Sequence, residues 1–372
     1  MDIEPENGLW MRFWLYSFFR KELKGMRIAI IGAGNMGGAI ARGLAQSGLS
    51  AVAASVSSPV PSAVALSAPA PSAESSGVSS SVAASSSASS TVAASASELS
   101  SGLSSAVASP ASAASFAPSA VGSQGSAGNP VALYELVVAN PSRQKLEALQ
   151  AEYPSVQITQ SNVEAVRGAD LVLLAVKPWK MEEVARELKP VLDYRTQMVA
   201  SVAGGVGLAD LSALYRHKNM LPPLFYVMPN TAVAVRQSMT FVAAQGASEE
   251  QTAAVVNLFR LLGEAMLVEE RLMDGGMALA SCGIAFAMRY IRAAMEGGVE
   301  LGFYPNEAKQ IVMQTLRGAV ELLQSTGNHP EAEIDRVTTP GGITIRGLNE
   351  MEHAGFTDSV IRGLRAARPL KK

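Results

Sequence analysis

The chain reads MRIAIIGAGNMGGAIARG over residues 26–43, and this stretch decides the fold. Residues 28–31 are an apolar run, which predicts a short buried strand. A helix should follow the glycines, because Ile40 and Leu44 recur on one face at helical spacing. Strand, glycine-rich turn and helix together predict the first unit of an α/β Rossmann domain with a mostly parallel, doubly wound sheet.

The glycines of this turn have the spacing of a dinucleotide-binding fingerprint. Gly32 permits a tight turn, Gly34 lets the backbone approach a pyrophosphate, and Gly37 lets helix and strand pack closely. The helix N-terminus favours an anion, so Asn35 and Met36 also belong to the predicted pyrophosphate site. A glycine-rich turn in some other α/β protein is the alternative interpretation.

The composition argues against several classes of protein. The 372 residues carry a formal net charge of −2, which gives no basic surplus to attract nucleic acid or an anionic membrane. Cys282 is the one cysteine, so the chain can form neither a disulfide framework nor a multi-cysteine zinc site. The three histidines show no metal-ligand spacing, and we expect no bound metal.

Residues 1–25 form an unusual leader. Residues 9–19 are aromatic and apolar, but Arg12 interrupts them and an acidic stretch precedes them. This pattern fits neither a secretory signal with a basic start nor a membrane span of about 20 apolar residues. Because Met26 directly precedes the first strand, we interpret the leader as a mis-called start, with an accessory helix as the alternative. A cytoplasmic location is the corresponding expectation.

Between about residues 50 and 130 the chain consists almost entirely of Ser, Ala, Val, Pro and Gly. Ser47-Gly48, just before it, is predicted to end the first helix. The tract has few large apolar side chains to bury and cannot offset the entropy of ordering itself. It is therefore predicted to be a disordered insertion in a surface loop, with a glycosylated stalk or a partner-binding tract as alternatives.

Regular patterning resumes with a predicted strand at 133–139 and a helix at 144–152. In the NAD-binding form of this fold, an Asp or Glu at the end of the second strand binds the ribose 2′-hydroxyl. Asn140, Ser142 and Arg143 occupy that turn here, and no carboxylate is present. They form a predicted 2′-phosphate site that favours NADPH over NADH, and a solvated turn with an exposed arginine is the alternative.

The apolar run 171–176 predicts a central strand that is buried on both faces. Ligands of open α/β sheets lie beyond the carboxyl ends of the strands. Val176, Lys177 and Pro178 should therefore line the cofactor crevice, with a simple strand terminator as the alternative. Further strands are predicted at 198–202, 224–228, 239–243 and 265–268, and a helix at 248–262.

Beyond residue 272 the chain changes to long helices with apolar periodicity. Their content of Ala, Met, Leu and Ile exceeds what a domain of about 100 residues needs for its own surface, which predicts a subunit interface. We therefore divide the chain into a Rossmann domain, 26–272, and a helical dimerisation and substrate domain, 273–372. The predicted helices are 275–297, 305–325, 331–337, 344–353 and 357–367, with a polar turn over 338–344.

Four motifs in this order resemble those of the pyrroline-5-carboxylate reductases, the enzymes of the last step of proline synthesis. They read IIGAGNMG at 30–37, LAVKP at 174–178, VMPNT at 227–231 and VTTPGGIT at 337–344. The resemblance covers nearly everything outside the leader and the insertion. It implies a Rossmann domain followed by a helical dimerisation domain, a homodimer of interlocked protomers, and further assembly of dimers into rings such as a decamer.

The same resemblance implies roles for individual residues. The Pro-Gly-Gly turn would offer backbone N–H groups to the substrate carboxylate, and Thr344 would hydrogen-bond the substrate ring. Thr344 and Asn230 are accordingly the predicted catalytic residues, and Asn162 would contact the ribose on the adenine side. The other implied residues are Thr339, Gly341 and Gly342 at the substrate, and Ala175 and Ala203 at the cofactor.

The implied reaction is hydride transfer from NADPH to C5 of 1-pyrroline-5-carboxylate, which gives L-proline. A protonated imine is already an electrophile, so the lack of an obvious acid–base pair fits this reaction. Tyr226 stands where the family commonly has Arg, and residues 280–285 depart from its Ser-Gly-Ser-Gly-Pro-Ala run. Two alternatives therefore remain. One is a related imine or β-hydroxyacid reductase, and the other is a dinucleotide-binding paralogue without activity.

Overall fold

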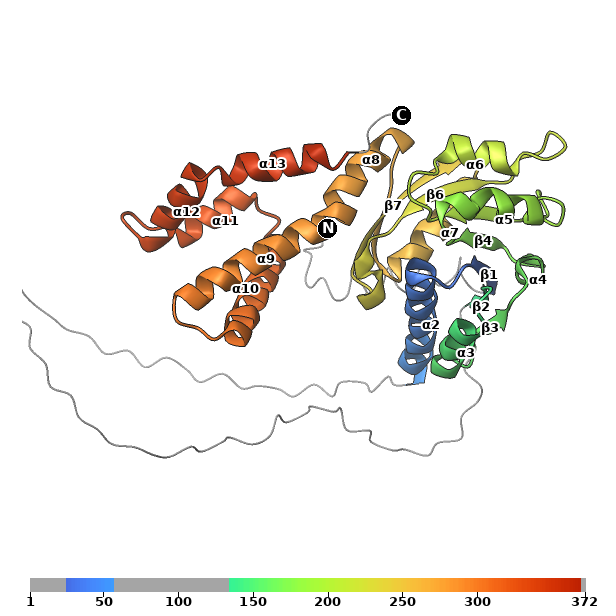
Figure 1. Ribbon diagram of the computed structural model, residues 1–372, viewed down its shortest axis with the longest axis horizontal. Coiled ribbons are helices and arrows are strands. Elements are labelled where there is room, and N and C mark those ends of the chain that lie inside the picture. The colour runs from blue at the N-terminus through green and yellow to red at the C-terminus, as the bar shows by residue number, and fades with distance from the viewer. Residues whose placement is uncertain (1–24, 57–133, 369–372) are drawn as a thin grey trace, which may run out of the picture. The chain divides into compact units, whose positions relative to one another are not determined.

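The computed structural model describes residues 25–56 and 134–368 (Figure 1). Its centre is an eight-stranded sheet in the order β3-β2-β1-β4-β5-β6-β7-β8. Neighbouring strands run parallel except β6 and β7, which are antiparallel, and this is the predicted mostly parallel, doubly wound sheet. The strands are β1 Met26–Ile31, β2 Tyr134–Ala139, β3 Gln157–Thr159, β4 Leu171–Leu174, β5 Met198–Ser201, β6 Leu224–Met228, β7 Ser238–Gln245 and β8 Gly263–Leu267.

The pairing register brings the carboxyl ends of the three central strands to one edge of the sheet. Ile31, the last residue of β1, pairs with Ala139 of β2 on one side and with Leu174 of β4 on the other. The strand order reverses between β1 and β4, and dinucleotides bind in the crevice outside such a switch point.

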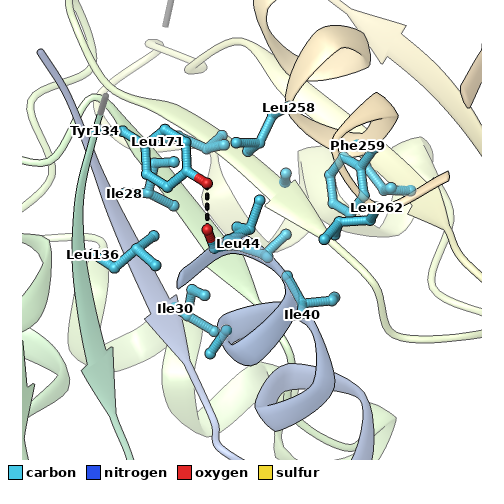
Figure 2. Packing of buried hydrophobic residues seen from close by; sticks show 14 of the residues in the cluster. Ile28, Ile30, Ile40, Leu44, Tyr134, Leu136, Leu171, Leu258, Phe259 and Leu262 are labelled. Atoms are coloured by element: carbon cyan, nitrogen blue, oxygen red, sulfur yellow. Dashed lines mark hydrogen bonds between the residues drawn. The ribbon is translucent and has the colours of Figure 1, made fainter. Parts of the chain in front are cut away.

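Helices cover both faces of the sheet, with one cluster of buried side chains on each face. One cluster joins α2, α3 and α7 to the sheet, and the other joins α4, α5 and α6 to it. Figure 2 shows the first cluster, in which Tyr134 donates a hydrogen bond to the carbonyl oxygen of Leu44. These helices are α2 Asn35–Val56, α3 Arg143–Glu152, α4 Asn162–Val166, α5 Met181–Leu188, α6 Leu208–Tyr215 and α7 Glu249–Arg260, and the short 3-10 helices η1 Pro178–Lys180 and η2 Thr231–Val235 lie between them.

Two predicted boundaries were wrong. The first helix does not end at Ser47-Gly48 but continues to Val56. Alanines follow Gly48 and no proline occurs before Pro59, and an interior glycine costs a helix only about 1 kcal/mol. The strand predicted over 171–176 ends at Leu174, because the chain leaves the ladder there and passes beside Gly32.

In the described chain beyond β8, the regular elements are all helices. The helical segment that opens with α8 passes through a π-helical stretch, Met277–Cys282, into α9. Helix α9 packs against α10, and α12 packs against α13 (Figure 1). The helices are η3 Glu270–Leu272, α8 Met273–Gly276, α9 Gly283–Glu300, α10 Pro305–Thr326, α11 Pro330–Val337, α12 Ile343–His353 and α13 Phe356–Ala366.

Two predictions fall largely outside the described residues. The leader lies there except for Gly25, and so does the Ser/Ala-rich insertion beyond Val56. No helix in the part of the chain that the structure describes is both long enough and apolar enough to cross a bilayer.

Candidate dinucleotide and substrate site

The glycine loop, residues 32–37, follows β1 at the switch point. Gly32 has a φ of +106° and donates its N–H to the carbonyl oxygen of Ala139 at 2.8 Å. A Cβ on Gly32 would lie 2.7 Å from the carbonyl oxygen of Ala175, and one on Gly37 would lie 2.0 Å from the carbonyl oxygen of Gly32. Both positions therefore require glycine, in the roles that the sequence predicted.

Gly34 differs from these two glycines, because a Cβ there would meet no atom within 4 Å. It is exposed together with Asn35, the first residue of α2. The first turn of α2 contains no acidic residue, so the positive end of the helix dipole is not offset by a side chain of that turn. Space, exposed amides and a helix N-terminus thus fit a pyrophosphate.

Asn140 joins the end of β2 to the glycine loop. Its Oδ1 accepts a hydrogen bond from the N–H of Ala33 at 3.0 Å, and its Nδ2 donates to the carbonyl oxygen of Ser142 at 3.3 Å. The side chain predicted to bind a 2′-phosphate therefore also fixes the position of the glycine loop.

Ser142 and Arg143 open helix α3 at the carboxyl end of β2. Ser142 is the N-cap, and its hydroxyl makes no capping hydrogen bond. Arg143 is exposed, and its Nε lies 2.7 Å from Oε1 of Glu147 one turn later. This hydrogen bond is the main reason that the pKa of the guanidinium is raised. The bond uses Nε, which leaves the other N–H groups of the guanidinium as donors for an anion.

Asn162 is the first residue of α4, and its Nδ2 donates to Oε2 of Glu187 on α5 at 2.8 Å. Ser161 caps this helix by accepting a hydrogen bond from the N–H of Glu164. The bond to Glu187 ties α4 to α5, and the carbonyl oxygen of the Asn162 amide can still accept a hydrogen bond from a hydroxyl.

Two of the predicted cofactor segments follow β4 and β5 at the carboxyl edge of the sheet. Ala175 donates its N–H to the carbonyl oxygen of Ile31 at 2.8 Å, and Val176 lies beside Gly32. Ala203, which follows β5, is buried. The structure therefore brings Ala175 and Val176 to the glycine loop, while Lys177 and Pro178, which follow them, are exposed.

A hydrogen-bond network that the sequence did not reveal holds the turn after β5. The N–H of Gly205 donates to Oη of Tyr226 on β6 at 3.2 Å, and the N–H of Leu208 donates to Oε1 of Glu270 at 2.6 Å. Burial raises the pKa of the Tyr226 phenol, and the hydrogen bond from Gly205 acts in the opposite direction. The available signal was Tyr226 itself, which departs from the motif of the family.

Asn230 is buried, and both its side-chain amide and its backbone N–H are hydrogen-bonded after the end of β6. Its Oδ1 accepts from the N–H of Ala232 at 3.0 Å, and its backbone N–H donates to Oγ of Ser238 at 3.1 Å. Its Nδ2 donates to the carbonyl oxygen of Ala280, in the π-helical stretch, at 3.3 Å. Asn230 thus connects the sheet to the start of the helical region.

The Pro-Gly-Gly loop, residues 338–342, lies between α11 and α12. Gly341 has a φ of +72°, and Gly342 donates its N–H to the carbonyl oxygen of Thr339 at 2.9 Å. Thr339 and Thr344 are exposed. Among the described residues, no hydrogen bond joins this loop to the strands of the sheet. Within the described part of one chain, therefore, no hydrogen bond holds the Pro-Gly-Gly loop next to the glycine loop.

The helical region exposes many apolar side chains. Helices α9, α11, α12 and α13 contain no buried residue in the described structure, and Ala308 is the buried residue of α10. Helices without a core of their own need a second apolar surface. The exposed apolar residues include Phe286, Met288, Tyr290, Ile311, Met313, Val320, Leu322, Val360 and Ile361.

The fold and this site define a class, the nicotinamide-dinucleotide oxidoreductases that pair a Rossmann domain with a helical self-association domain. Residues 270–370 match the family model described as pyrroline-5-carboxylate reductase dimerisation. Residues 27–113 and 113–205 match the one described as NADP oxidoreductase coenzyme F420-dependent. The chain belongs to the pyrroline-5-carboxylate reductase family, as its relatives establish.

Pyrroline-5-carboxylate reductase 2 of Dictyostelium discoideum is 32% identical over 243 residues, which cover 62% of this chain and 80% of that protein. Pyrroline-5-carboxylate reductase 1 of the same organism is 34% identical over 242 residues, which cover 62% of this chain but 43% of that protein. The fold is shared with a crystal structure of Plasmodium falciparum pyrroline carboxylate reductase with NADP bound. Its TM-score is 0.62 at 19% identity, with 92% of this chain and 96% of that chain covered.

The fold class and the family predicted from the sequence are therefore confirmed. With the family comes its reaction, the NAD(P)-dependent reduction of pyrroline-5-carboxylate to proline. The match of residues 270–370 to a dimerisation model and the exposed apolar side chains of the same helices both indicate self-association.

Proposed function

We propose that this chain reduces 1-pyrroline-5-carboxylate to L-proline and prefers NADPH to NADH. The observation that carries the proposal is the glycine loop at the switch point, beside a turn after β2 that holds Arg143 and no carboxylate. NADPH, when bound, supplies a hydride to C5 of the protonated cyclic imine, whose nitrogen keeps its proton. The protein has to hold donor and acceptor together and exclude water.

The cofactor residues divide into three groups along the crevice. The glycine loop binds the pyrophosphate through backbone N–H groups and the N-terminus of α2. Ser142 and Arg143 bind the 2′-phosphate, and Asn140 contributes mainly by positioning the loop through Ala33. The proposed set is Gly32, Gly34, Asn35, Met36 and Gly37 at the pyrophosphate, Asn140, Ser142, Arg143 and Asn162 on the adenosine side, and Ala175, Val176, Lys177, Pro178 and Ala203 on the nicotinamide side.

The substrate end combines Asn230 with the Pro-Gly-Gly loop. The N–H of Gly341 and the first N–H groups of α12 suit the substrate carboxylate together with Thr339, while the N–H of Gly342 is engaged with the Thr339 carbonyl and holds the turn. The Thr344 hydroxyl hydrogen-bonds the ring nitrogen. Because the amide of Asn230 is engaged with Ala232 and Ala280, we assign it a positioning role at the base of the substrate site.

We further propose a homodimer in which the Pro-Gly-Gly loop of one protomer completes the crevice of the other, with decamers as the larger assembly. The exposed apolar helices support this arrangement. A domain boundary at 272/273 and a cytoplasmic location belong to the same proposal. The eight strands end by Leu267, which supports the boundary, and cell fractionation would test the location.

Steady-state kinetics with pure protein test the function. We expect oxidation of NADPH that depends on pyrroline-5-carboxylate, with a lower KM for NADPH than for NADH. The variant Arg143→Ala should raise the KM for NADPH by about tenfold, since it removes a charged donor to the 2′-phosphate, and leave that for NADH nearly unchanged. Lys145→Ala, a change of a nearby cation on the same helix, is the control.

Two alternatives predict other outcomes. A related imine reductase would turn over a different cyclic imine and leave pyrroline-5-carboxylate unreduced. A dinucleotide-binding paralogue would bind NADPH in calorimetry without reducing any cyclic imine, and the departure of residues 280–285 from the family run is the observation in its favour. Absence of NADPH oxidation with pyrroline-5-carboxylate would overturn our assignment.

A further inference from the structure

Trp179 is a highly exposed aromatic side chain that follows β4 at the carboxyl edge of the sheet. It lies in η1, directly after the Lys177-Pro178 pair, and 76% of its surface is accessible. The ammonium group of Lys177 lies 6.0 Å from the centre of its ring. A tryptophan at such exposure leaves a large flat apolar face open to a ligand.

The chain around Trp179 fixes its place at the carboxyl edge of the sheet. Val176 lies beside Gly32 of the glycine loop, and Trp179 follows it by three residues. Helix α5 begins at Met181 and packs against α4, to which the Asn162–Glu187 hydrogen bond joins it. Helix α4 in turn packs on β1, β2 and β3, the strands of the adenosine half of the fold.

We propose that Trp179 is the stacking surface for the adenine ring of the dinucleotide. This rests on the proposed binding of NADPH and adds a residue that none of the motifs assigns. The exposed position suits the ring that does not react, because the nicotinamide has to be shielded from water.

Calorimetry on the full-length chain with two ligands tests the proposal. One is NADPH, and the other is 2′,5′-ADP, which holds the adenine and the 2′-phosphate without the nicotinamide. Base stacking on an aromatic side chain contributes on the order of a tenfold to hundredfold gain in affinity. Trp179→Ala should therefore weaken both ligands by a similar factor of about tenfold or more, while Trp179→Phe should keep most of the affinity.

Met220→Ala is the matched control. Met220 is also an exposed apolar side chain, 44% accessible, but it precedes β6 and so lies at the opposite edge of the sheet. Its removal should leave both affinities unchanged. Loss of NADPH affinity without loss of 2′,5′-ADP affinity would overturn the proposal in favour of a nicotinamide contact, and unchanged affinity for both would overturn it outright.

Fluorescence separates stacking from an indirect structural effect. The chain has three tryptophans, and Trp10→Phe with Trp14→Phe leaves Trp179 as the only emitter. Saturating 2′,5′-ADP should quench that emission, and an unchanged emission at saturation would contradict stacking. A wrong assignment of the function would show itself differently. The parent chain would then not reduce pyrroline-5-carboxylate, whatever its affinity for 2′,5′-ADP.

Discussion

A methyl group added at Gly34 would meet no atom within 4 Å, whereas one added at Gly37 would lie 2.0 Å from the carbonyl oxygen of Gly32. Substitutions at these two glycines therefore distinguish an effect on cofactor binding from an effect on the stability of the fold. Gly34→Ala should leave the unfolding transition unchanged and weaken NADPH by about a hundredfold, because its methyl group enters the space of the pyrophosphate. Gly37→Ala should also lower the free energy of unfolding by about 1–3 kcal/mol or more, since the backbone has to move.

Calorimetry and thermal unfolding of both variants check this prediction. Gly168→Ala is a poor control, because its φ is +68°, but Gly318→Ala in α10 adds a methyl group that meets nothing within 4 Å. It should leave the NADPH affinity unchanged and should not lower the free energy of unfolding, since alanine favours a helix over glycine by up to about 1 kcal/mol. Normal NADPH affinity in Gly34→Ala would show that the pyrophosphate does not approach this backbone.

Tyr215 is a fully buried tyrosine whose Oη has no hydrogen-bond partner among the described residues. Leaving such a donor unpaired costs about 1–3 kcal/mol, so Tyr215→Phe should raise the free energy of unfolding by about 1 kcal/mol. Burial is also the main cause that raises the pKa of this phenol above its ordinary value.

The raised pKa of Tyr215 gives the sign of a pH effect. The unfolded chain ionises this phenol near pH 10 and the folded chain only at higher pH. Stability is therefore fully present below about pH 10 and falls as the pH rises above it. Urea unfolding at pH 8 and pH 10.5 should show a smaller loss for Tyr215→Phe than for the parent chain, and equal losses would contradict the assignment.

At the scale of the elements, apolar runs predicted the presence of the central strands because both faces of a central strand are buried. All four residues of β4 and all five of β6 are buried, and their runs were recognisable without any tertiary information. The short elements β3 and α4 span three and five residues, fewer than an apolar period needs to show.

The sequence likewise predicted one part of the candidate site and missed another part. The glycine fingerprint is local, so the sequence predicted where its residues lie. The bond from Ala33 to Asn140 joins residues 107 positions apart, and the bond from Asn230 to Ala280 joins residues 50 apart. Such contacts depend on tertiary packing that local pattern cannot contain, so the sequence could not show that Ala232 and Ala280 engage the Asn230 amide.

Substitutions of Asn230 test whether its hydrogen bond to Ala280 fixes the start of the helical region at the sheet. Asn230→Ala removes the cap of η2 and the donor to the Ala280 carbonyl, so the free energy of unfolding should fall by about 1–3 kcal/mol. Asn230→Asp keeps the oxygen that accepts from Ala232 and loses only the donor to Ala280. It should still fold, with a loss of stability comparable to that of Asn230→Ala, because a buried carboxylate oxygen then faces the Ala280 carbonyl oxygen.

Kinetics of Asn230→Asp then distinguish positioning from direct contact. A positioning residue should lower kcat with little change in the KM for pyrroline-5-carboxylate, because the π-helical stretch shifts while the carboxylate-binding loop stays intact. A rise in KM with unchanged kcat would instead indicate direct contact with the substrate. Ser212→Ala, which removes a hydroxyl on α6 that is hydrogen-bonded to Gln245, is the control.

For the whole molecule, the question is whether one chain holds a complete site. Helices α11, α12 and α13, which flank the Pro-Gly-Gly loop, contain no buried residue in the described structure, so a second chain has to cover them. If that chain also receives the loop, each site consists of the glycine loop of one protomer and the Pro-Gly-Gly loop of the other.

Mixed dimers test this division. Gly34→Ala damages the cofactor crevice, and Gly341→Asp adds a negative charge to the loop proposed to bind the substrate carboxylate; each variant alone should be nearly inactive. A mixed dimer places the intact glycine loop and the intact Pro-Gly-Gly loop in one of its two sites. Random co-refolding of equal amounts should therefore restore about a quarter of the parental kcat. If the loop served its own chain, every site would carry one damaged half and no activity would return.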